Sequence, residues 1–389
     1  MNETRSGFGP WHRSARGLLL CAVLLHAAAC REPAGGTPGS GQPSVGGVRV
    51  AWRVPLSTGA SLHGPAADGE RFYAVGNRHL EAYDAHTGAR AWSERPDFGT
   101  APANYVVRDG RVLGAGSLAI ALDAGTGREL WRFAPDGSAS LGESDADADA
   151  FYFGTATRRV YAVRAADGTR LWSTDAGPEW EHRAIVRGVT VSGDTVYAAV
   201  DQFATRNGER SVGWIVALHR ASGAVLWRYR NGSGDDQRSI GSAPRVAGRL
   251  LLAVDYPRNT FLAVDRFTAQ EVWQTPGLPG FAGAEEAPVV AGDVAYGASY
   301  DRHVYALDVQ TGRVRWKTRT PSGNNGTAVC GSRILVNFLG LGVLDRDTGR
   351  LLGTALDGKQ DFPTTGFAVS GNRAFVAGYA AAYGLECPD

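Results

Sequence analysis

The chain has 389 residues, of which 43% are hydrophobic and ten are Trp, so it holds enough apolar area to bury a large core. Its formal charge at pH 7 is +1, from 40 basic and 39 acidic residues. Nucleic-acid binding needs cations gathered against phosphate, and a nearly neutral chain offers no electrostatic case for it. Composition therefore excludes nucleic acid as the expected partner and favours a large globular body.

The N-terminus has the features of an export signal. Arg5, Arg13 and Arg16 form a basic start, and a short apolar run follows over 17–29. This run is too short to cross a bilayer and is typical of a secretory signal peptide. The sequence AAAC ending at Cys30 resembles a bacterial lipobox, so we expect residues 1–29 to be removed and Cys30 to be lipidated. Plain cleavage after the alanines is the open alternative.

Residues 30–47 continue as a segment rich in Pro, Gly and Ser, which predicts a flexible tether behind the lipidated Cys30. Arg31, rather than Asp, follows the cysteine. By resemblance to lipoprotein sorting rules, this favours the outer membrane. We therefore expect a periplasmic protein that a lipid anchors to the outer membrane.

One motif recurs along the rest of the chain: an apolar strand, an Asp-to-Gly turn, and a Trp four residues after the Gly position. A repeat of roughly 40 to 55 residues indicates one repeat architecture rather than independent domains. The copies are YDAHTGARAW (83–92), LDAGTGRELW (122–131), VRAADGTRLW (163–172), LHRASGAVLW (218–227), VDRFTAQEVW (264–273), LDVQTGRVRW (307–316) and LDRDTGRLLG (344–353).

Each repeat contains four short strands separated by turn residues. In 287–316 they are PVV, VAYGAS, HVYALD and RVRW. In the turn, the Asp side chain can cap backbone amides, and Gly accepts the positive φ that other residues resist. Four antiparallel strands in about 40 residues, repeated along the chain, predict β-propeller blades. We expect each Trp to fill the wedge between two blades while its N–H finds a backbone acceptor.

The two ends of the chain predict one more blade. Residues 366–389 supply three strands after the seventh turn, and VRVAWRV (48–54) supplies a single strand with Trp52 at the Trp position. Joining them closes the ring and removes exposed sheet edges. The predicted fold is all-β: an eight-bladed β-propeller of four-stranded antiparallel blades over 48–387, closed by an N-terminal strand that completes the last blade.

Cys330 and Cys387 lie near predicted strand ends of the last two blades, on the same face. Export to an oxidising compartment permits a disulfide between them. Two separate buried thiols are the alternative, because spacing along the sequence does not establish the required Cα approach.

The repeat Y-A-L-D-x-x-T-G-x-x-x-W, with GSAPRVAG (241–248) ahead of one copy, resembles that of the PQQ-like β-propeller superfamily over about residues 47–387. The resemblance implies one of two branches. Quinoprotein dehydrogenases bind pyrroloquinoline quinone and calcium and use an Asp base, whereas outer-membrane protein assembly factor BamB-type lipoproteins are non-enzymatic propellers. The chain is similar to the second branch in length, blade count and N-terminal processing. It lacks the adjacent cysteine pair common at the quinone, so the resemblance implies neither catalysis nor a cofactor.

The run SDADADAF (144–151) holds Asp145, Asp147 and Asp149, whose oxygens are of the type that calcium prefers. The run falls at a turn between the first and second strands of its blade, and alternation sends the side chains to different sides. We therefore expect a solvated turn and no metal. The sequence also contains no nucleophile elbow, HExxH motif or phosphate loop in a fitting context.

The innermost strand of each blade begins at one face of a propeller, so its first residues should ring the mouth of the central channel. A water-filled mouth is polar in any case; a small polar ligand or a partner's loop seated there is the alternative. The predicted mouth residues are His63, Asn104, Gly142 with Glu143, Arg187, Ser242, Glu286, Asn325 and Thr365.

Loops that exceed the repeat minimum suggest a binding surface, because closure does not require them. The fourth repeat is the longest, with extra residues in 177–183 and 201–213, and segments 231–241 and 276–287 are also extended. Strand polarity predicts all four on the mouth face over blades 4 to 6, although loops also lengthen without a partner. Aromatic and Arg residues anchor interfaces, and the candidates here are Trp180, Arg183, Phe203, Arg206, Arg210, Arg238, Phe281 and Glu286.

The leading functional hypothesis is a non-catalytic periplasmic scaffold at the outer membrane, with a protein partner in the cell envelope such as the barrel-assembly machinery. The alternative is a propeller that binds or senses a small ligand or a surface polymer. A quinone-dependent dehydrogenase is the third reading, which the cysteine pattern disfavours.

Overall fold

The computed structural model describes residues 44–56, 64–76, 79–136, 140, 142–177, 184–202, 212–232, 238–255, 260–275, 288–299, 301–322, 326–338, 340–357, 366–378 and 380–389. They belong to one compact unit, Gly35–Asp389. Within these ranges every regular element is a strand, and no helix there is long and apolar enough to cross a membrane.

The strands form eight four-stranded antiparallel sheets, here called blades 1 to 8, each given from the centre outward. Blade 1 consists of β2 (Ala66–Ala67), β3 (Arg71–Gly76), β4 (His79–Asp84) and β5 (Arg90–Glu94), and blade 2 of β6 (Tyr105–Arg108), β7 (Arg111–Ala115), β8 (Ala119–Asp123) and β9 (Glu129–Phe133). Blade 3 consists of β10 (Asp145–Ala146), β11 (Ala150–Gly154), β12 (Arg159–Arg164) and β13 (Arg170–Asp175), and blade 4 of β14 (Ala184–Ser192), β15 (Thr195–Gln202), β16 (Val212–His219) and β17 (Val225–Arg230). Blade 5 consists of β18 (Arg245–Ala247), β19 (Leu250–Asp255), β20 (Thr260–Asp265) and β21 (Glu271–Gln274), and blade 6 of β22 (Val289–Ala291), β23 (Val294–Ser299), β24 (His303–Asp308) and β25 (Val314–Arg319). Blade 7 consists of β26 (Gly326–Cys330), β27 (Arg333–Phe338), β28 (Gly340–Asp345) and β29 (Leu351–Asp357), and blade 8 of β30 (Ala368–Ser370), β31 (Arg373–Ala377), β32 (Ala381–Glu386) and β1 (Arg49–Pro55).

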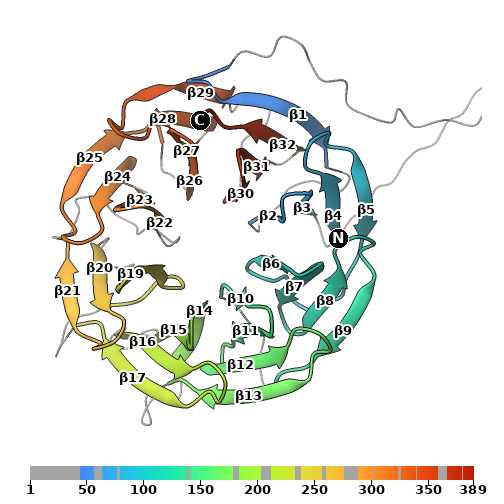
Figure 1. The fold of residues 1–389 in the computed structure, drawn as a ribbon, viewed down its shortest axis with the longest axis vertical. Helices are drawn as coiled ribbons and strands as arrows, with labels where there is room; N and C mark the ends of the chain where they lie inside the picture. Colours follow the sequence, from blue (N-terminus) through green and yellow to red (C-terminus); the bar gives the residue numbers. More distant parts are fainter. Residues whose placement is uncertain are drawn as a thin grey trace, which may run out of the picture. The chain divides into compact units, whose positions relative to one another are not determined.

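The eight blades form a closed ring (Figure 1). Each innermost strand contacts the innermost strand of the next blade, and β30 contacts β2, so the cycle is complete. Blade 8 is built from both ends of the chain, because β1 pairs antiparallel with β32 and Trp52 lies opposite Gly384. The predicted eight-bladed propeller, including its closure by the N-terminal strand, is confirmed.

The Asp-to-Gly turns join the third and fourth strands of a blade and form what we call the turn face. In blade 2, Asp123 accepts hydrogen bonds from the backbone N–H (2.8 Å) and hydroxyl (2.8 Å) of Thr126. These bonds favour the ionised carboxylate and lower the pKa of Asp123. Gly127 follows with a φ of +75°. The side chain of Asp123 thus fixes the turn, as predicted.

At seven of the eight junctions the repeated Trp joins a blade to the next, as predicted. Its Nε1–H donates to the carbonyl of the residue after the first turn position in the following blade. Its indole lies over the turn glycine, except in blade 5, where Ala269 stands at the Gly position. The described pairs are Trp52–Ala85 (3.1 Å), Trp92–Ala124 (3.0 Å), Trp131–Ala165 (2.9 Å), Trp172–Arg220 (2.8 Å), Trp227–Arg266 (3.1 Å), Trp273–Val309 (2.9 Å) and Trp316–Arg346 (3.0 Å).

The hydrophobic core is divided among the wedges between blades. Between blades 8 and 1, Phe72 and Phe375 stack with ring centroids 5.2 Å apart, and Trp52 lies 6.0 Å from each. Opposite each Trp the third strand carries a small residue; at Gly384, a Cβ would come within 2.2 Å of the Trp52 ring. Burial of apolar area between blades is the main stabilising contribution to such a core.

The extra length of the fourth repeat is used partly for longer strands. β14 has nine residues, and β15 and β16 have eight each. Asp201 pairs with Gly213 and Gln202 with Val212, so the ends of the predicted loop 201–213 continue the sheet. Blade 4 therefore extends the β15–β16 hairpin beyond the repeat minimum.

Candidate partner-binding face and channel mouth

The mouth face is the face at which the innermost strands begin, opposite the turn face. Of the predicted mouth residues, the structure describes Asn104, Gly142, Glu143, Arg187 and Ser242. The others lie outside the described residues: His63, Glu286, Asn325 and Thr365.

Asn104 connects two blades at this mouth. Its Nδ2 donates to the Ser144 carbonyl (3.0 Å), and its Oδ1 accepts from the Ser144 backbone N–H (2.8 Å) and hydroxyl (2.9 Å). Asn104 precedes β6 in blade 2, whereas Ser144 precedes β10 in blade 3. The amide is therefore committed to holding neighbouring innermost strands together.

Glu143 connects blade 3 to blades 4 and 5. Its N–H donates to the Arg187 carbonyl (3.2 Å), and its own carbonyl accepts from Val189 N–H (3.0 Å). Its Oε2 lies 3.1 Å from Nη2 of Arg245 on β18. Gly142 permits this approach, since a Cβ there would lie 2.2 Å from the Arg187 carbonyl oxygen.

Arg187 pairs with a fully buried carboxylate. Its Nε and Nη2 lie 3.3 and 3.4 Å from Oδ2 of Asp201, whose residue is 0% exposed. Burial, with a smaller contribution from the nearby Asp255, raises the pKa of Asp201 to about 6, although Arg187 and Ser239 favour the ionised form. Burial of its side chain therefore brings the pKa of Asp201 closer to neutral pH than that of an exposed Asp.

Asp201 belongs to a buried polar network between blades 4 and 5. Asp255, also 0% exposed, accepts from the Ser239 backbone N–H (3.2 Å). Asn231 donates from its Nδ2 to the Ser239 carbonyl (3.2 Å) and from its backbone N–H to the Gly213 carbonyl (2.9 Å). This network fixes the segment that enters β18.

Ser242 is 2% exposed, and among the described residues its hydroxyl has no hydrogen-bond partner. The structure therefore buries this side chain rather than presenting it to solvent at the mouth.

A cavity of about 290 Å³ is bounded by the innermost strands of six blades, β2, β6, β10, β14, β18 and β30. Its charged lining residues are Asp145 and Arg245, and about half of the wall is Ala and Val. Arg245 is paired with Glu143, and Asp145 accepts N–H bonds from Val191 (2.9 Å) and Ala146 (2.8 Å). Because Asp145 and Arg245 are both already engaged in these contacts, the cavity wall suits the recognition of a partner's surface better than acid–base catalysis.

The acidic run of blade 3 is a capped turn that also contacts blade 4. Asp147 accepts from the N–H groups of Asp149 and Ala150 (both 2.9 Å). Arg220 Nη1 lies 2.8 Å from Asp147 and 3.1 Å from Asp149. Asp145 points instead to β14, and burial raises its pKa. In the described ranges no three His, Cys, Asp or Glu residues form a group suited to a metal ion.

Of the predicted partner-binding residues, the structure describes only Arg238. Its Nη1 donates to Oε1 of Gln274 (2.6 Å), and its stem packs over Gly232, so it is half-buried between blades 4 and 5. The remaining candidates lie outside the described residues; they are Trp180, Arg183, Phe203, Arg206, Arg210, Phe281 and Glu286. The predicted lipidation site, Cys30, also lies outside them.

Sequence reasoning missed an aromatic anchor at the same face. Trp214, on β16, is half-buried, and the exposed guanidinium of Arg230 lies 5.8 Å from its ring centroid. Trp214 stands outside the repeated Trp position, which was the available signal. Such aromatic–Arg pairs are common at interface centres.

The cysteines meet at the turn face. Cys330 and Cys387 are joined by a disulfide, with their Cα atoms 5.0 Å apart.

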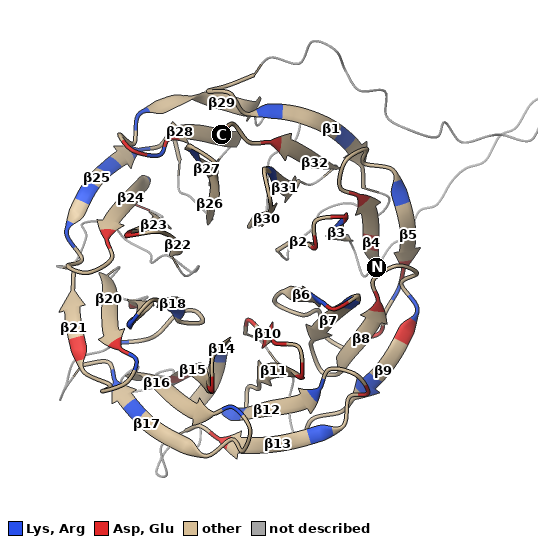
Figure 2. Ribbon diagram, viewed as in Figure 1, with Lys and Arg blue, Asp and Glu red and all other residues tan. Residues whose placement is uncertain are grey.

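Basic and acidic residues are interspersed over the coloured part of the ring rather than gathered in one sector (Figure 2). A single-sign surface that would steer a highly charged partner is therefore not evident there.

A family model described as outer membrane protein assembly factor BamB matches residues 47–211 and 211–355. The chain belongs to this family. The matched ranges run through the repeats from the closing strand to blade 7.

Individual relatives of the BamB-family chain are distant. BamB of Yersinia pestis is 28% identical over 57% of this chain and 56% of its own length. Serine/threonine-protein kinase AfsK of Streptomyces griseus is 29% identical over 60% of this chain and 32% of its own length. The 1-butanol dehydrogenase (quinone) of Thauera butanivorans is 30% identical over 35% of this chain and 23% of its own length. The chain thus spans about half or less of these relatives.

Among solved structures, BamB from Moraxella catarrhalis superposes with a TM-score of 0.67 and 18% sequence identity. The match covers 87% of this chain and 97% of that one. At such low identity the likeness establishes a common fold and leaves the function to be argued from the residues.

Proposed function

We propose that the protein is a non-catalytic scaffold of the cell envelope, anchored to the outer membrane by a lipid on Cys30, with a BamB-like role in outer-membrane protein assembly. The observation that carries the proposal is the BamB-family match over residues 47–355. The predicted export signal at 1–29 supports it, as does the Cys330–Cys387 disulfide, since disulfides persist in oxidising compartments.

The described residues around the axis do not fit a quinone cofactor. Pyrroloquinoline quinone carries several carboxylates, and Arg245 is the cation among the residues that line the described cavity. Arg245 is already paired with Glu143 at 3.1 Å. The disulfide joins Cys330 to Cys387 at the turn face, whereas the quinoproteins commonly place adjacent cysteines at the cofactor. These points favour a scaffold over a dehydrogenase.

We place the partner on the mouth face over blades 4 to 6. The described part of this surface contains Trp214 with Arg230, Arg187 and Arg238, the residue types that anchor protein interfaces. The extended β15–β16 hairpin of blade 4 and the network around Asp201 give the surface a rigid base, and rigid sites bind with less loss of conformational freedom.

A second candidate function is binding of a small ligand or surface polymer, which the 290 Å³ cavity among the innermost strands favours. Such cavities are at the lower end of the usual size for small-molecule sites. The two functions differ in what remains bound when the protein is purified.

The test is co-purification of the full chain from detergent-solubilised outer membrane. Recovery of the barrel-assembly machinery supports the scaffold, and retained carbohydrate without that machinery supports the alternative. A variant with Trp180→Ala, Phe203→Ala and Arg206→Ala should recover much less machinery while its thermal stability stays nearly unchanged. Phe267→Ala is the matched control, because Phe267 is 61% exposed but lies on the opposite, turn face. Equal recovery by both variants would remove the proposed surface.

A further inference from the structure

Seven of the eight junctions between described blades use the same clasp. In each, a Trp on the outermost strand donates to a carbonyl in the turn of the next blade and covers its Gly position. Between blades 2 and 3, for example, Trp131 donates to Ala165 (2.9 Å), and a Cβ on Gly168 would lie 2.6 Å from its ring. This contact joins a strand to a turn more than 30 residues away, so it holds blades together rather than shaping one blade.

The junction between blades 7 and 8 lacks both halves of this clasp. Gly353 stands on β29 where the other outermost strands carry Trp. Blade 8 has no Asp-to-Gly turn, because β32 ends at Glu386 and β1 comes from the other end of the chain. Cys387 holds the place of the acceptor residue: its N–H donates to the Asn372 carbonyl (2.8 Å), as Ala165 N–H donates to the Asp149 carbonyl (2.9 Å) in blade 3.

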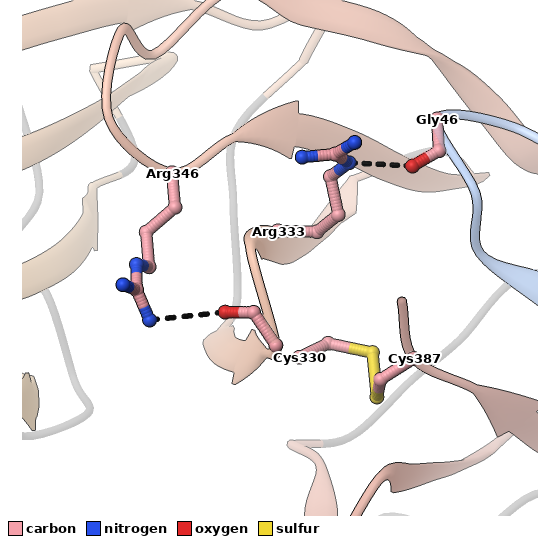
Figure 3. The surroundings of a disulfide bond; sticks show 6 residues. Gly46, Cys330, Arg333, Arg346 and Cys387 are labelled. Carbon is pink, nitrogen blue, oxygen red and sulfur yellow. Dashed lines mark hydrogen bonds between the residues drawn. A yellow bond between two sulfur atoms is a disulfide. The ribbon is translucent and has the colours of Figure 1, made fainter. Parts of the chain in front are cut away.

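The space left by the missing indole is filled by the segment that precedes β1. Val45 lies against position 353, where an added Cβ would come within 2.9 Å of its Cγ1. The carbonyl of Gly46 accepts a hydrogen bond from Nε of Arg333, at the start of β27 (Figure 3). Gly47 faces Pro388, with 3.1 Å between a Cβ built on Gly47 and the proline Cβ. The two ends of the propeller therefore meet at this junction.

The disulfide crosses the same junction (Figure 3). Cys330 ends β26 in blade 7, and Cys387 follows β32 in blade 8; they are 0% and 8% exposed. Arg346 supports the blade 7 side by donating to the Gly331 carbonyl at 3.0 Å. The disulfide thus bonds blade 7 to the residue that stands in the acceptor position of the clasp.

We propose that the Cys330–Cys387 disulfide is a redox-dependent latch that replaces the tryptophan clasp at the closing junction. Chain ends open first unless they are tied down, and this junction contains both ends. With the cysteines reduced, the segment 44–55 and the C-terminal strand open locally while the clasped blades stay folded. Oxidation joins the two thiols by exchange with a disulfide-bearing oxidant, whose S–S bond breaks; the oxidant takes up the two electrons and the two protons and becomes a dithiol. The ring is therefore fully latched only in an oxidising compartment.

The latch also lies where the predicted tether enters the fold. Residues 30–43 of the predicted tether precede Val45 and β1 in the sequence, so a pull on the proposed lipid anchor would act on this junction first. A covalent bond between blades 7 and 8 keeps the partner of β1, strand β32, in place under that pull. This role of the latch holds whether the mouth face binds a protein or a small ligand.

The test is amide hydrogen exchange by mass spectrometry on the full chain, oxidised, reduced with a phosphine, and as Cys330→Ala/Cys387→Ala. We expect exchange in 44–55 and 381–389 to speed up by about tenfold or more on reduction and in the double variant, with blades 3 to 5 unchanged. Thiol labelling in the peptides that contain Cys330 and Cys387 verifies the redox state. Trp131→Phe is the matched control, and it should loosen the junction of blades 2 and 3 instead.

Two results would overturn the latch. Equal protection of 44–55 in the oxidised and fully reduced protein would mean that Val45, Arg333 and the strand pairing close the ring without it. Uniformly faster exchange in all blades would mean that the disulfide stabilises the whole domain rather than this junction. If the double variant does not fold, reduction of the folded wild type provides the same comparison.

Discussion

Replacing Gly168 by Ala asks whether the clasp needs glycine for space as well as for backbone conformation. Gly168 has a φ of +73°, and a Cβ there would lie 2.6 Å from Cε3 of Trp131. Gly110 has nearly the same φ, +70°, but nothing lies within 4 Å of a Cβ built on it. Gly110→Ala therefore measures the backbone cost alone, and Gly168→Ala adds the packing cost.

The magnitudes follow from these two contributions. A left-handed backbone costs an ordinary residue about 1–2 kcal/mol, and the stiffer unfolded chain offsets about 0.4–1 kcal/mol, so Gly110→Ala should destabilise by about 1 kcal/mol. Overpacking against a buried indole adds about 1–3 kcal/mol, which puts Gly168→Ala at about 2–4 kcal/mol. Blade 5 already carries Ala269 at this position, with φ +60°, beside a half-buried Trp227. Ala269→Gly should therefore stabilise, by about 1 kcal/mol.

The assay is urea unfolding followed by Trp fluorescence, with the free energy of unfolding compared among the three variants and wild type. Gly168→Ala should unfold at clearly lower urea than Gly110→Ala, with similar slopes. Equal costs for the two variants would refute the idea that the indole requires glycine for space. A loss of stability in Ala269→Gly would show that the tight turn tolerates Ala better than this geometry implies.

Three further changes have separate expected outcomes. Trp131→Phe removes the donor to the buried Ala165 carbonyl and should cost about 1–3 kcal/mol in urea unfolding, against near-zero cost for Phe267→Ala. Burial raises the pKa of Asp201 to about 6 in the folded protein, above the usual 3.8 of an Asp side chain, so its ionisation opposes folding. The contribution of Asp201 to the free energy of unfolding should therefore be most favourable below about pH 4 and fall by about 3 kcal/mol as the pH rises through 6. Asp201→Asn should flatten that fall, and a pH profile equal to that of wild type would contradict the raised pKa of Asp201. Asn104→Ala leaves the Ser144 backbone N–H and hydroxyl without their acceptor and should cost about 1–3 kcal/mol in the same assay, whereas a free energy equal to wild type would show that water replaces the amide.

The repeat was readable from the sequence because each of its parts is local and occurs many times. The Asp, the Gly and the Trp each act within one turn or against the next blade, so seven imperfect copies agree even where single residues depart from the pattern. His219, Ala269 and Gly353 are such departures, and all eight blades form despite them. Trp52 was assigned to the closing strand for the same reason, and its hydrogen bond to Ala85 matches those of the other clasps.

The mouth was harder to predict, because its residues occur once and their partners lie on other blades. Counting along the repeat found Asn104, Glu143 and Arg187, but not that Glu143 reaches Arg245 or that Arg187 neutralises Asp201. The Asp201 pairing depends on the extended β15–β16 hairpin, which the sequence presents only as a long loop.

Sequence alone determined the fold class, the blade count, the closing strand and the structural use of the repeated Trp, because these follow from a periodic pattern of short-range interactions. Tertiary structure decided the rest. It joined Cys330 to Cys387, whereas their spacing in the sequence was also compatible with two free thiols. It also placed Val45 in the gap that Gly353 leaves. Both outcomes depend on two ends of a 389-residue chain meeting at one junction, and that approach is set by closure of the whole ring rather than by any local run of residues.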